Sequence, residues 1–138
     1  MYLHRILTRS PSNLKGEELT DKILILVTSS NRRECRKIAK HLVEKRWAAC
    51  VNITSPVRSI YRWEGKVEEA REFVLLLKST RQLFPTIRKA IIKLHSYKVP
   101  EVICLPILDG SQAFLHWIDE SVKHPGGADV IPGEEPEM

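Results

Sequence analysis

The sequence predicts an α+β domain in which one antiparallel sheet is covered by helices on one face. Three observations support this fold class. Residues 23–28 (ILILVT) form a short, branched apolar run typical of a buried strand. Residues 31–43 and 83–94 repeat apolar side chains at the three- and four-residue spacing of a helix. Residues 47–80 flank the turn signal Glu64-Gly65-Lys66, which predicts a long hairpin.

The predicted order of elements is β-α-β-β-α-β-α. Because each βαβ crossover must be right-handed, the economical arrangement is a ferredoxin-like split βαβ sandwich with a long hairpin. The open face of that sheet is apolar, and the hairpin is longer than one small domain needs. Both features favour an oligomer that pairs sheet edges.

The first helix is predicted from its start and from its two faces. Asn31 and Glu34 form a capping-box pattern, in which Asn31 accepts an early helix N–H and Glu34 reaches back. Cys35, Ile38 and Leu42 then fall on one apolar face. The other face is basic and is expected to be solvated: it carries Arg32, Arg33, Arg36, Lys37 and Lys40.

The remaining elements follow from local signals. Pro56 interrupts the first arm of the hairpin, so a bend, bulge or edge is expected there. Residues 67–80 return as a strand. Residues 99–107 predict another buried strand, closed by the Asp109-Gly110 turn. Ser111 is expected to cap a last helix that turns Leu115, Ile118 and Val122 inward.

Charge divides the 138 residues into three parts. Residues 1–22 have net charge +1 and are predicted to be a flexible leader, faintly like a mitochondrial presequence. Residues 23–124 have net charge +8 and form the predicted domain. Residues 125–138 have net charge −4 and three prolines, which predict a disordered acidic tail. No run of 18 apolar residues exists, so no membrane span is predicted.

The three cysteines are widely spaced and form no metal-finger or disulfide pattern. A reducing compartment, most simply the cytoplasm, is therefore favoured. Mitochondrial or secretory targeting stays open, because the leader is ambiguous.

Four motifs occur in order along the chain: WAACVN (47–52), SIYRWEGKVEE (59–69), EFVLLLKST (72–80) and HSYKVPEVICLPI (95–107). With these motifs, residues 23–120 resemble the CutA divalent-cation tolerance family. The resemblance implies a ferredoxin-like homotrimer without catalytic activity, whose relatives are linked to tolerance of copper and other divalent cations. It also implies an alternative: a signalling or scaffold module of the nitrogen-regulatory type, with a protein partner such as anchored acetylcholinesterase and no essential metal.

The resemblance transfers to individual positions. Cys50 matches the cysteine of the family's AACVN motif, and Trp63 matches its YxWxGK turn. Glu72 and Lys78 match the acid and the base of the third strand, and His95, Tyr97 and Glu101 match its HPYxxPE motif. Ser96 stands where the family usually has proline. Ser29-Ser30 replaces its common Cys-Pro, which removes a soft metal ligand.

A metal site is the first functional hypothesis. Cys50 and His95 offer a thiolate and an imidazole, which copper and zinc favour, and Glu101 or Glu72 could add oxygen ligands. These residues are far apart in sequence, so distant segments or different subunits would have to bring them together. The alternative is structural: Cys50 packs within a strand, and the imidazole of His95 bonds a carbonyl.

A cleft for a small anionic ligand is the second hypothesis. Trp63, Glu72, Lys78 and Tyr97 have polar tips near predicted strand ends. The alternatives are that Trp63 packs between subunits and that Glu72 and Lys78 form a charge pair along one strand face.

Nucleic-acid binding and catalysis are both disfavoured. The predicted third strand has only one aromatic residue and no glycine, unlike the stacking strand of an RNA-recognition module. The segment SSNRR (29–33) contains the arginine and asparagine of an acylphosphatase-type loop but no glycine-rich phosphate cradle.

Overall fold

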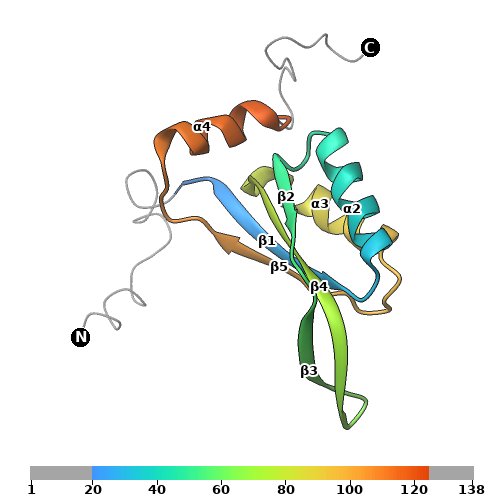
Figure 1. The fold of residues 1–138 in the computed structure, drawn as a ribbon. Coiled ribbons are helices and arrows are strands. Elements are labelled where there is room, and N and C mark those ends of the chain that lie inside the picture. Colours follow the sequence, from blue (N-terminus) through green and yellow to red (C-terminus); the bar gives the residue numbers. More distant parts are fainter. Residues whose placement is uncertain (1–19, 125–138) are drawn as a thin grey trace, which may run out of the picture.

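The computed structural model describes residues 20–124. Within this range, five strands and three α-helices follow one another (Figure 1). A single 3-10 turn, Arg81–Leu83, leads into the second of these helices. The elements are β1 (Lys22–Ser29), α2 (Arg32–Glu44), β2 (Cys50–Ile53), β3 (Val57–Trp63), β4 (Lys66–Thr80), α3 (Phe84–Leu94), β5 (Val102–Pro106) and α4 (Gln112–Ser121).

The strand order is β2-β4-β1-β5, with β3 pairing to β4 beyond the end of β2, and every pair is antiparallel. Helix α2 connects β1 to β2, and α3 connects β4 to β5, each across one intervening strand. Both helices lie on the same face of the sheet (Figure 1). The predicted ferredoxin-like split βαβ arrangement is confirmed.

The hairpin of β3 and β4 projects beyond the two helices (Figure 1). Its register runs from Val57 opposite Glu72 to Trp63 opposite Lys66. The two turn residues, Glu64 and Gly65, have φ values of 50° and 81°, the left-handed conformation of a tight hairpin turn. A break around Pro56 separates β2 from β3, as predicted, because proline cannot donate to the ladder.

The core lies between the sheet and the two helices. Alternate residues of β1 and β4 turn toward α2 and α3, and their partners on the helices recur at helical spacing. These side chains are at most 1% exposed: Ile23, Ile25, Val27, Leu75, Leu77, Ile38, Leu42, Ile87 and Ile91.

The other face of the sheet, here the open sheet face, carries no helix from α2 or α3 (Figure 1). Register places Leu26 of β1 between Leu76 of β4 and Ile103 of β5 on this face. Leu26 and Leu76 are half-buried, and Ile103 is 46% exposed. An apolar sheet surface of this kind is typical of an interface.

The predicted start of α2 is partly confirmed. Asn31 is the N-cap, and its side chain accepts the backbone N–H of Glu34 at 2.9 Å. The reciprocal half of the capping box is wrong: the Glu34 carboxylate instead accepts from the Ser29 hydroxyl at 2.8 Å and the Ser96 backbone N–H at 3.1 Å. The carboxylate thus turns from its own helix end toward the loop after α3.

Two other predictions need correction. Ser111 occupies the N-cap position of α4 but makes no side-chain capping bond among the described residues. The predicted buried strand over 99–107 is shorter, Val102–Pro106, because residues 99–101 belong to the loop that leaves α3. It is also not buried, because β5 is an edge strand and Ile103 and Leu105 are exposed. Leu115, Ile118 and Val122 are buried as predicted.

The predicted leader (1–22) and acidic tail (125–138) lie outside the described residues, except for residues 20–22, where β1 begins at Lys22. No helix within residues 20–124 is long and apolar enough to cross a membrane. Cys35, Cys50 and Cys104 are all free thiols.

Candidate functional site

A cleft of about 610 Å³ opens along strand β3 of the projecting hairpin. Four segments meet there: the end of β1, strand β3, the middle of β4, and the loop between α3 and β5. The hairpin supplies one wall and the loop supplies the other. The lining residues are Thr28, Ser59, Ile60, Tyr61, Trp63, Glu72, Tyr97, Lys98, Val99 and Glu101.

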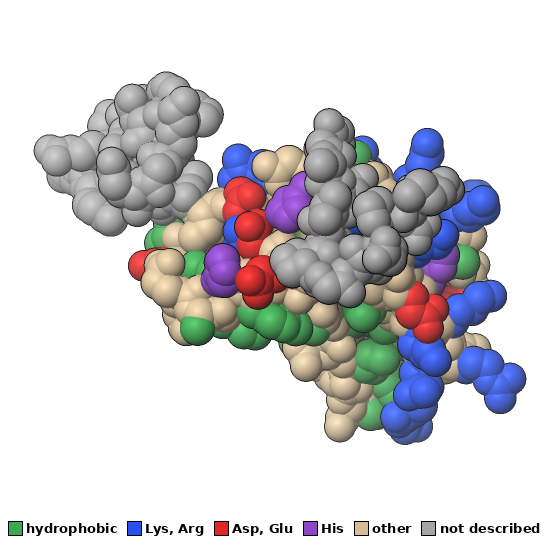
Figure 2. Space-filling model, turned by 90° about the horizontal axis from the view of Figure 1, so that it is seen from above, with side chains coloured by type: hydrophobic (Ala, Val, Ile, Leu, Met, Phe, Trp, Pro, Cys, Tyr) green, Lys and Arg blue, Asp and Glu red, His purple; other side chains and the backbone are tan. Residues whose placement is uncertain are grey.

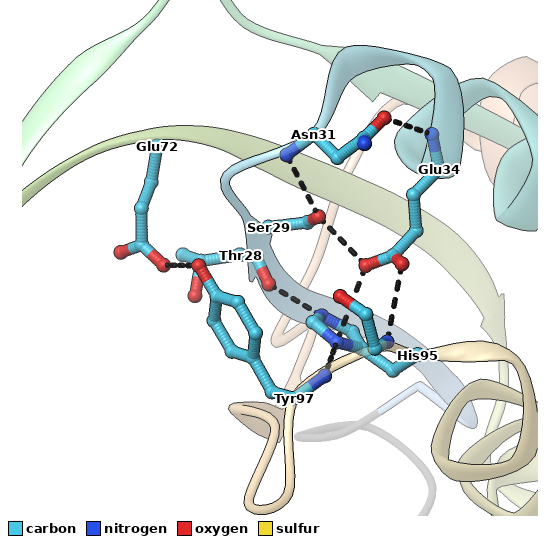
Figure 3. A network of polar contacts seen from close by, with 8 residues as sticks. Thr28, Ser29, Asn31, Glu34, Glu72, His95 and Tyr97 are labelled. Carbon is cyan, nitrogen blue, oxygen red and sulfur yellow. Dashed lines mark hydrogen bonds and ion pairs between the residues drawn. The ribbon is translucent and has the colours of Figure 1, made fainter.

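A buried carboxylate forms part of the cleft wall. Glu72 is only 7% exposed, and its Oε2 accepts a hydrogen bond of 2.7 Å from the hydroxyl of Tyr97 (Figure 3). Burial raises the pKa of Tyr97; Ser30 works against the rise, and Glu72 adds to it. The phenol therefore stays protonated at neutral pH and remains a donor to Glu72.

The imidazole of His95 lies beneath the cleft and holds its loop in place. The side chain is fully buried. Its Nε2 lies 2.7 Å from the Thr28 carbonyl oxygen, and its Nδ1 lies 3.1 Å from the Tyr97 backbone nitrogen, which donates to it (Figure 3). The neutral tautomer with hydrogen on Nε2 satisfies both contacts. His95 thereby ties the end of β1 to the residue that bonds Glu72.

Glu34 extends this network to α2. Its Oε2 lies 3.3 Å from Nδ1 of His95 and accepts from Ser29, which in turn accepts the backbone N–H of Asn31 (Figure 3). Burial acts to raise the pKa of Glu34, but the hydrogen bonds from Ser29 and Ser96 prevail and lower it. The carboxylate is therefore ionised at neutral pH, although it is largely enclosed.

The cleft brings together three of the four predicted ligand-binding residues: Trp63, Glu72 and Tyr97. Lys78, the fourth, lies away from it. Its ammonium bonds the side-chain oxygen of Asn52 on β2 and lies 3.4 Å from the Leu76 carbonyl. The alternative charge pair between Glu72 and Lys78 is not formed, because six residues along a strand span about 20 Å.

The predicted metal ligands separate within one chain. Glu101 lines the cleft, and His95 lies beneath it with both ring nitrogens engaged. In the sheet register, Cys50 is paired with Lys78 of β4. Thr28, whose carbonyl contacts His95, is paired with Val74 of the same strand. Four residues of strand place Cys50 about 13 Å farther along the sheet. A set of Cys50, His95 and Glu101 around one ion therefore stays a prediction that needs a second copy of the chain.

Sequence reasoning missed one wall of the cleft and the layer beneath it. Of the residues on β3 that line the cleft, Trp63 was predicted, but Ser59 and Tyr61 were not; both precede Trp63 at a spacing of two, which was the available signal. Ser29 and Glu34 gave no such signal, because only the tertiary fold brings them to His95.

The cleft offers oxygen donors and aromatic surface. Its charged lining is Glu72, Glu101 and Lys98, so the carboxylates outnumber the ammonium group. The described residues contain no group of three or more His, Cys, Asp or Glu side chains arranged to hold a metal ion.

Comparison with known proteins gives a consistent result. Residues 23–121 match the family model described as "CutA1 divalent ion tolerance protein". The "Divalent-cation tolerance protein CutA" of Thermus thermophilus is 45% identical over 98 residues, which cover 71% of this chain and 95% of that protein. "Protein CutA" of Mus musculus is 41% identical over 105 residues, covering 74% of this chain but only 59% of the mouse protein.

A solved structure agrees with the sequence match. The "Periplasmic divalent cation tolerance protein CutA from Archaeoglobus fulgidus" superimposes with a TM-score of 0.72 at 41% identity, covering 74% of this chain and 99% of that one. The family match and the shared fold both cover the described domain, with its hairpin and its cleft. The chain belongs to the CutA1 divalent ion tolerance protein family.

Proposed function

We propose that this protein works as a non-enzymatic homotrimer that binds a divalent cation, copper among them, in a reducing compartment such as the cytoplasm. The proposal rests on the buried position of the Glu72 carboxylate in the cleft wall. This carboxylate is 7% exposed, faces a cleft of about 610 Å³, and has a phenol as its one described side-chain hydrogen-bond partner. A cation in the cleft would offset the cost of burying that charge.

The cleft chemistry supports cation binding. Glu72 and Glu101 are carboxylates on two separate segments, and hard divalent cations prefer such oxygen ligands. Copper prefers thiolate or imidazole, and Cys50 is the half-buried thiol that fits it. His95 is assigned a positioning role, because both of its nitrogens already bond within the chain.

The open sheet face supports the trimer. Leu26, Leu76 and Ile103 give it an apolar centre, and the long hairpin reaches beyond the chain's own helices. Register places Cys50, opposite Lys78, on this same face. Association through this face would bring Cys50 close to donors from another copy, which is what a copper site at Cys50 requires.

Calorimetric titration tests the cation site. Mn²⁺ and Cu²⁺ are titrated into the wild type, Glu72→Gln and Cys50→Ser, with Glu69→Gln as a matched control on the same strand. We expect Glu72→Gln to weaken Mn²⁺ binding about tenfold or more and Cys50→Ser to weaken Cu²⁺ binding, whereas Glu69→Gln changes neither. Equal affinities in all four proteins would contradict both ligand assignments.

A second function fits the shape of the cleft: a ligand-carrying signalling or scaffold module without an essential metal. About 610 Å³ is far more space than an ion needs, and Tyr61 and Trp63 give the cleft an aromatic wall. Under this function, Trp63→Ala would abolish small-molecule binding in chelator-treated protein, and the metal titrations would not respond to Glu72→Gln.

A further inference from the structure

A second cavity, of about 560 Å³, lies where β1 passes into α2 and is separate in its chemistry from the first. The residues that line it are Ser30, Asn31, Arg32, Arg33, Arg71 and Phe73. Its charged lining consists of three guanidinium groups and no carboxylate. Lys and Arg side chains also gather on the side of the molecule where α2 lies in Figure 1 (Figure 2).

The arginines come from two different elements. Arg32 and Arg33 begin α2, whereas Arg71 belongs to β4. Phe73 follows Arg71 by two residues and therefore lies on the same side of the strand. The Arg32 guanidinium lies 4.8 Å from the centre of the Phe73 ring, a cation–π contact that keeps this charge at the cavity.

None of these arginines forms an ion pair with a residue in the range 20–124. Arg58, one strand away, shows the contrast, because it pairs with Glu69 at 2.8 Å. The two acidic neighbours in sequence are engaged elsewhere. Glu34 bonds Ser29 and Ser96, and Glu72 bonds Tyr97 on the other side of β4. Three positive charges thus share one cavity whose described lining contains no carboxylate.

We infer that this cavity binds a small phosphate-bearing anion. Guanidinium groups match phosphate oxygens through paired N–H donors, and three of them suit a ligand with more than one negative charge. Ser30 and Asn31 add neutral polar groups at the rim. The volume exceeds that of a single phosphate, so a phosphate ester or a diphosphate fits better. The inference is independent of the cation site, because three guanidinium groups repel a cation.

The sequence contains part of the signal for this site. The segment SSNRR (29–33) has the arginine and the asparagine of a phosphate-binding loop but lacks its glycines. The fold compensates by bringing Arg71 from a distant strand, so side chains replace the backbone cradle.

Calorimetry with pyrophosphate tests the inference. The titration is run on the full chain in EDTA, at constant ionic strength, so that divalent cations play no part. The proteins are the wild type, Arg33→Gln, Arg71→Gln and the control Arg36→Gln. Arg36 is an exposed arginine on the same helix that does not line the cavity. Thermal unfolding of each protein verifies that it is folded.

We expect saturable binding to the wild type, a loss of about tenfold or more for both cavity variants, and a change within about twofold for Arg36→Gln. Absence of binding to the wild type would overturn the inference. So would equal weakening by all three variants, which indicates a general charge effect. Tighter binding of an oligonucleotide, sensitive to Arg36, would assign the basic surface to nucleic acid instead.

Discussion

Nδ1 of His95 lies 3.3 Å from Oε2 of Glu34, and both side chains are largely removed from solvent. The same nitrogen receives the backbone N–H of Tyr97 at 3.1 Å. Two groups thus contact the buried Nδ1 atom: the Glu34 carboxylate from the start of α2 and the Tyr97 backbone N–H from the loop between α3 and β5. The imidazole therefore helps to position Tyr97, whose hydroxyl donates a hydrogen bond to the Glu72 carboxylate.

Replacement of His95 by alanine is expected to destabilise the fold. The variant leaves the Thr28 carbonyl and the Tyr97 N–H without their partner and opens a cavity, which together cost about 2–4 kcal/mol. Urea denaturation measures this loss. The control is His116→Ala: His116 is exposed and pairs with Glu120 on its own helix, so its loss should cost no more than about 0.5 kcal/mol. Similar losses for both variants would contradict the structural role of His95.

The lowered pKa of Glu34 predicts an acid-sensitive contribution to stability. A carboxyl group with a pKa lower in the folded state than in the unfolded state stabilises the fold at neutral pH. That stabilisation is lost as the pH falls through the folded-state pKa. Glu34→Gln should therefore be less stable than the wild type at pH 7, and the difference should narrow between about pH 5 and 3.

Denaturation curves across this range measure the effect. Glu69→Gln is the control, because Glu69 is half exposed and forms a surface ion pair with Arg58. The difference in unfolding free energy between Glu69→Gln and the wild type should stay small at every pH. If the difference in unfolding free energy between Glu34→Gln and the wild type did not change with pH, the charge of the Glu34 carboxylate would not contribute to stability.

The trimer makes a prediction about the open sheet face. Ile103 is 46% exposed in a single chain, so Ile103→Glu should hardly change the stability of a monomer. In a trimer built on this face, the same change buries a charge and disrupts assembly. Light scattering should report about three times the chain mass of 15.9 kDa for the wild type and a single-chain mass for the variant.

Ile92→Glu is the matched control for Ile103→Glu. Ile92 is 53% exposed on α3, on the helical side of the sheet, and its replacement should leave the mass unchanged. A wild-type mass near 15.9 kDa would contradict the assembly outright.

Sequence reasoning succeeded where the signal is local. The apolar run of β1, the helical spacing of α2 and the Glu64-Gly65 turn are encoded in adjacent residues, so the fold could be predicted from them. The Asn31 cap was predicted for the same reason. The actual contacts of the Glu34 carboxylate were not predicted. It bonds Ser29 and Ser96 instead of the helix end, and Ser96 lies 62 positions away in the sequence.

The site was only partly predictable for a related reason. Glu72 and Tyr97 were identified, but not their hydrogen bond, which joins residues 25 positions apart. Lys78 was placed in the cleft because its polar tip lies near a predicted strand end, and its even spacing from Glu72 suggested the alternative of a charge pair. Six residues of strand length separate the two, and a pattern of period two contains no information about distance along the strand. Arg71 was overlooked because its role depends on the loop at residues 30–33.

The most direct test of cation binding is an anomalous difference map from crystals of the wild type grown with Mn²⁺ or Cu²⁺. The proposal predicts a Mn²⁺ peak in the cleft, within about 2.0–2.6 Å of carboxylate oxygens of Glu72 or Glu101. It also predicts that crystals of Glu72→Gln lose that peak, while any Cu²⁺ peak lies at Cys50. Crystals without a peak at either place, under saturating metal, would contradict the central claim.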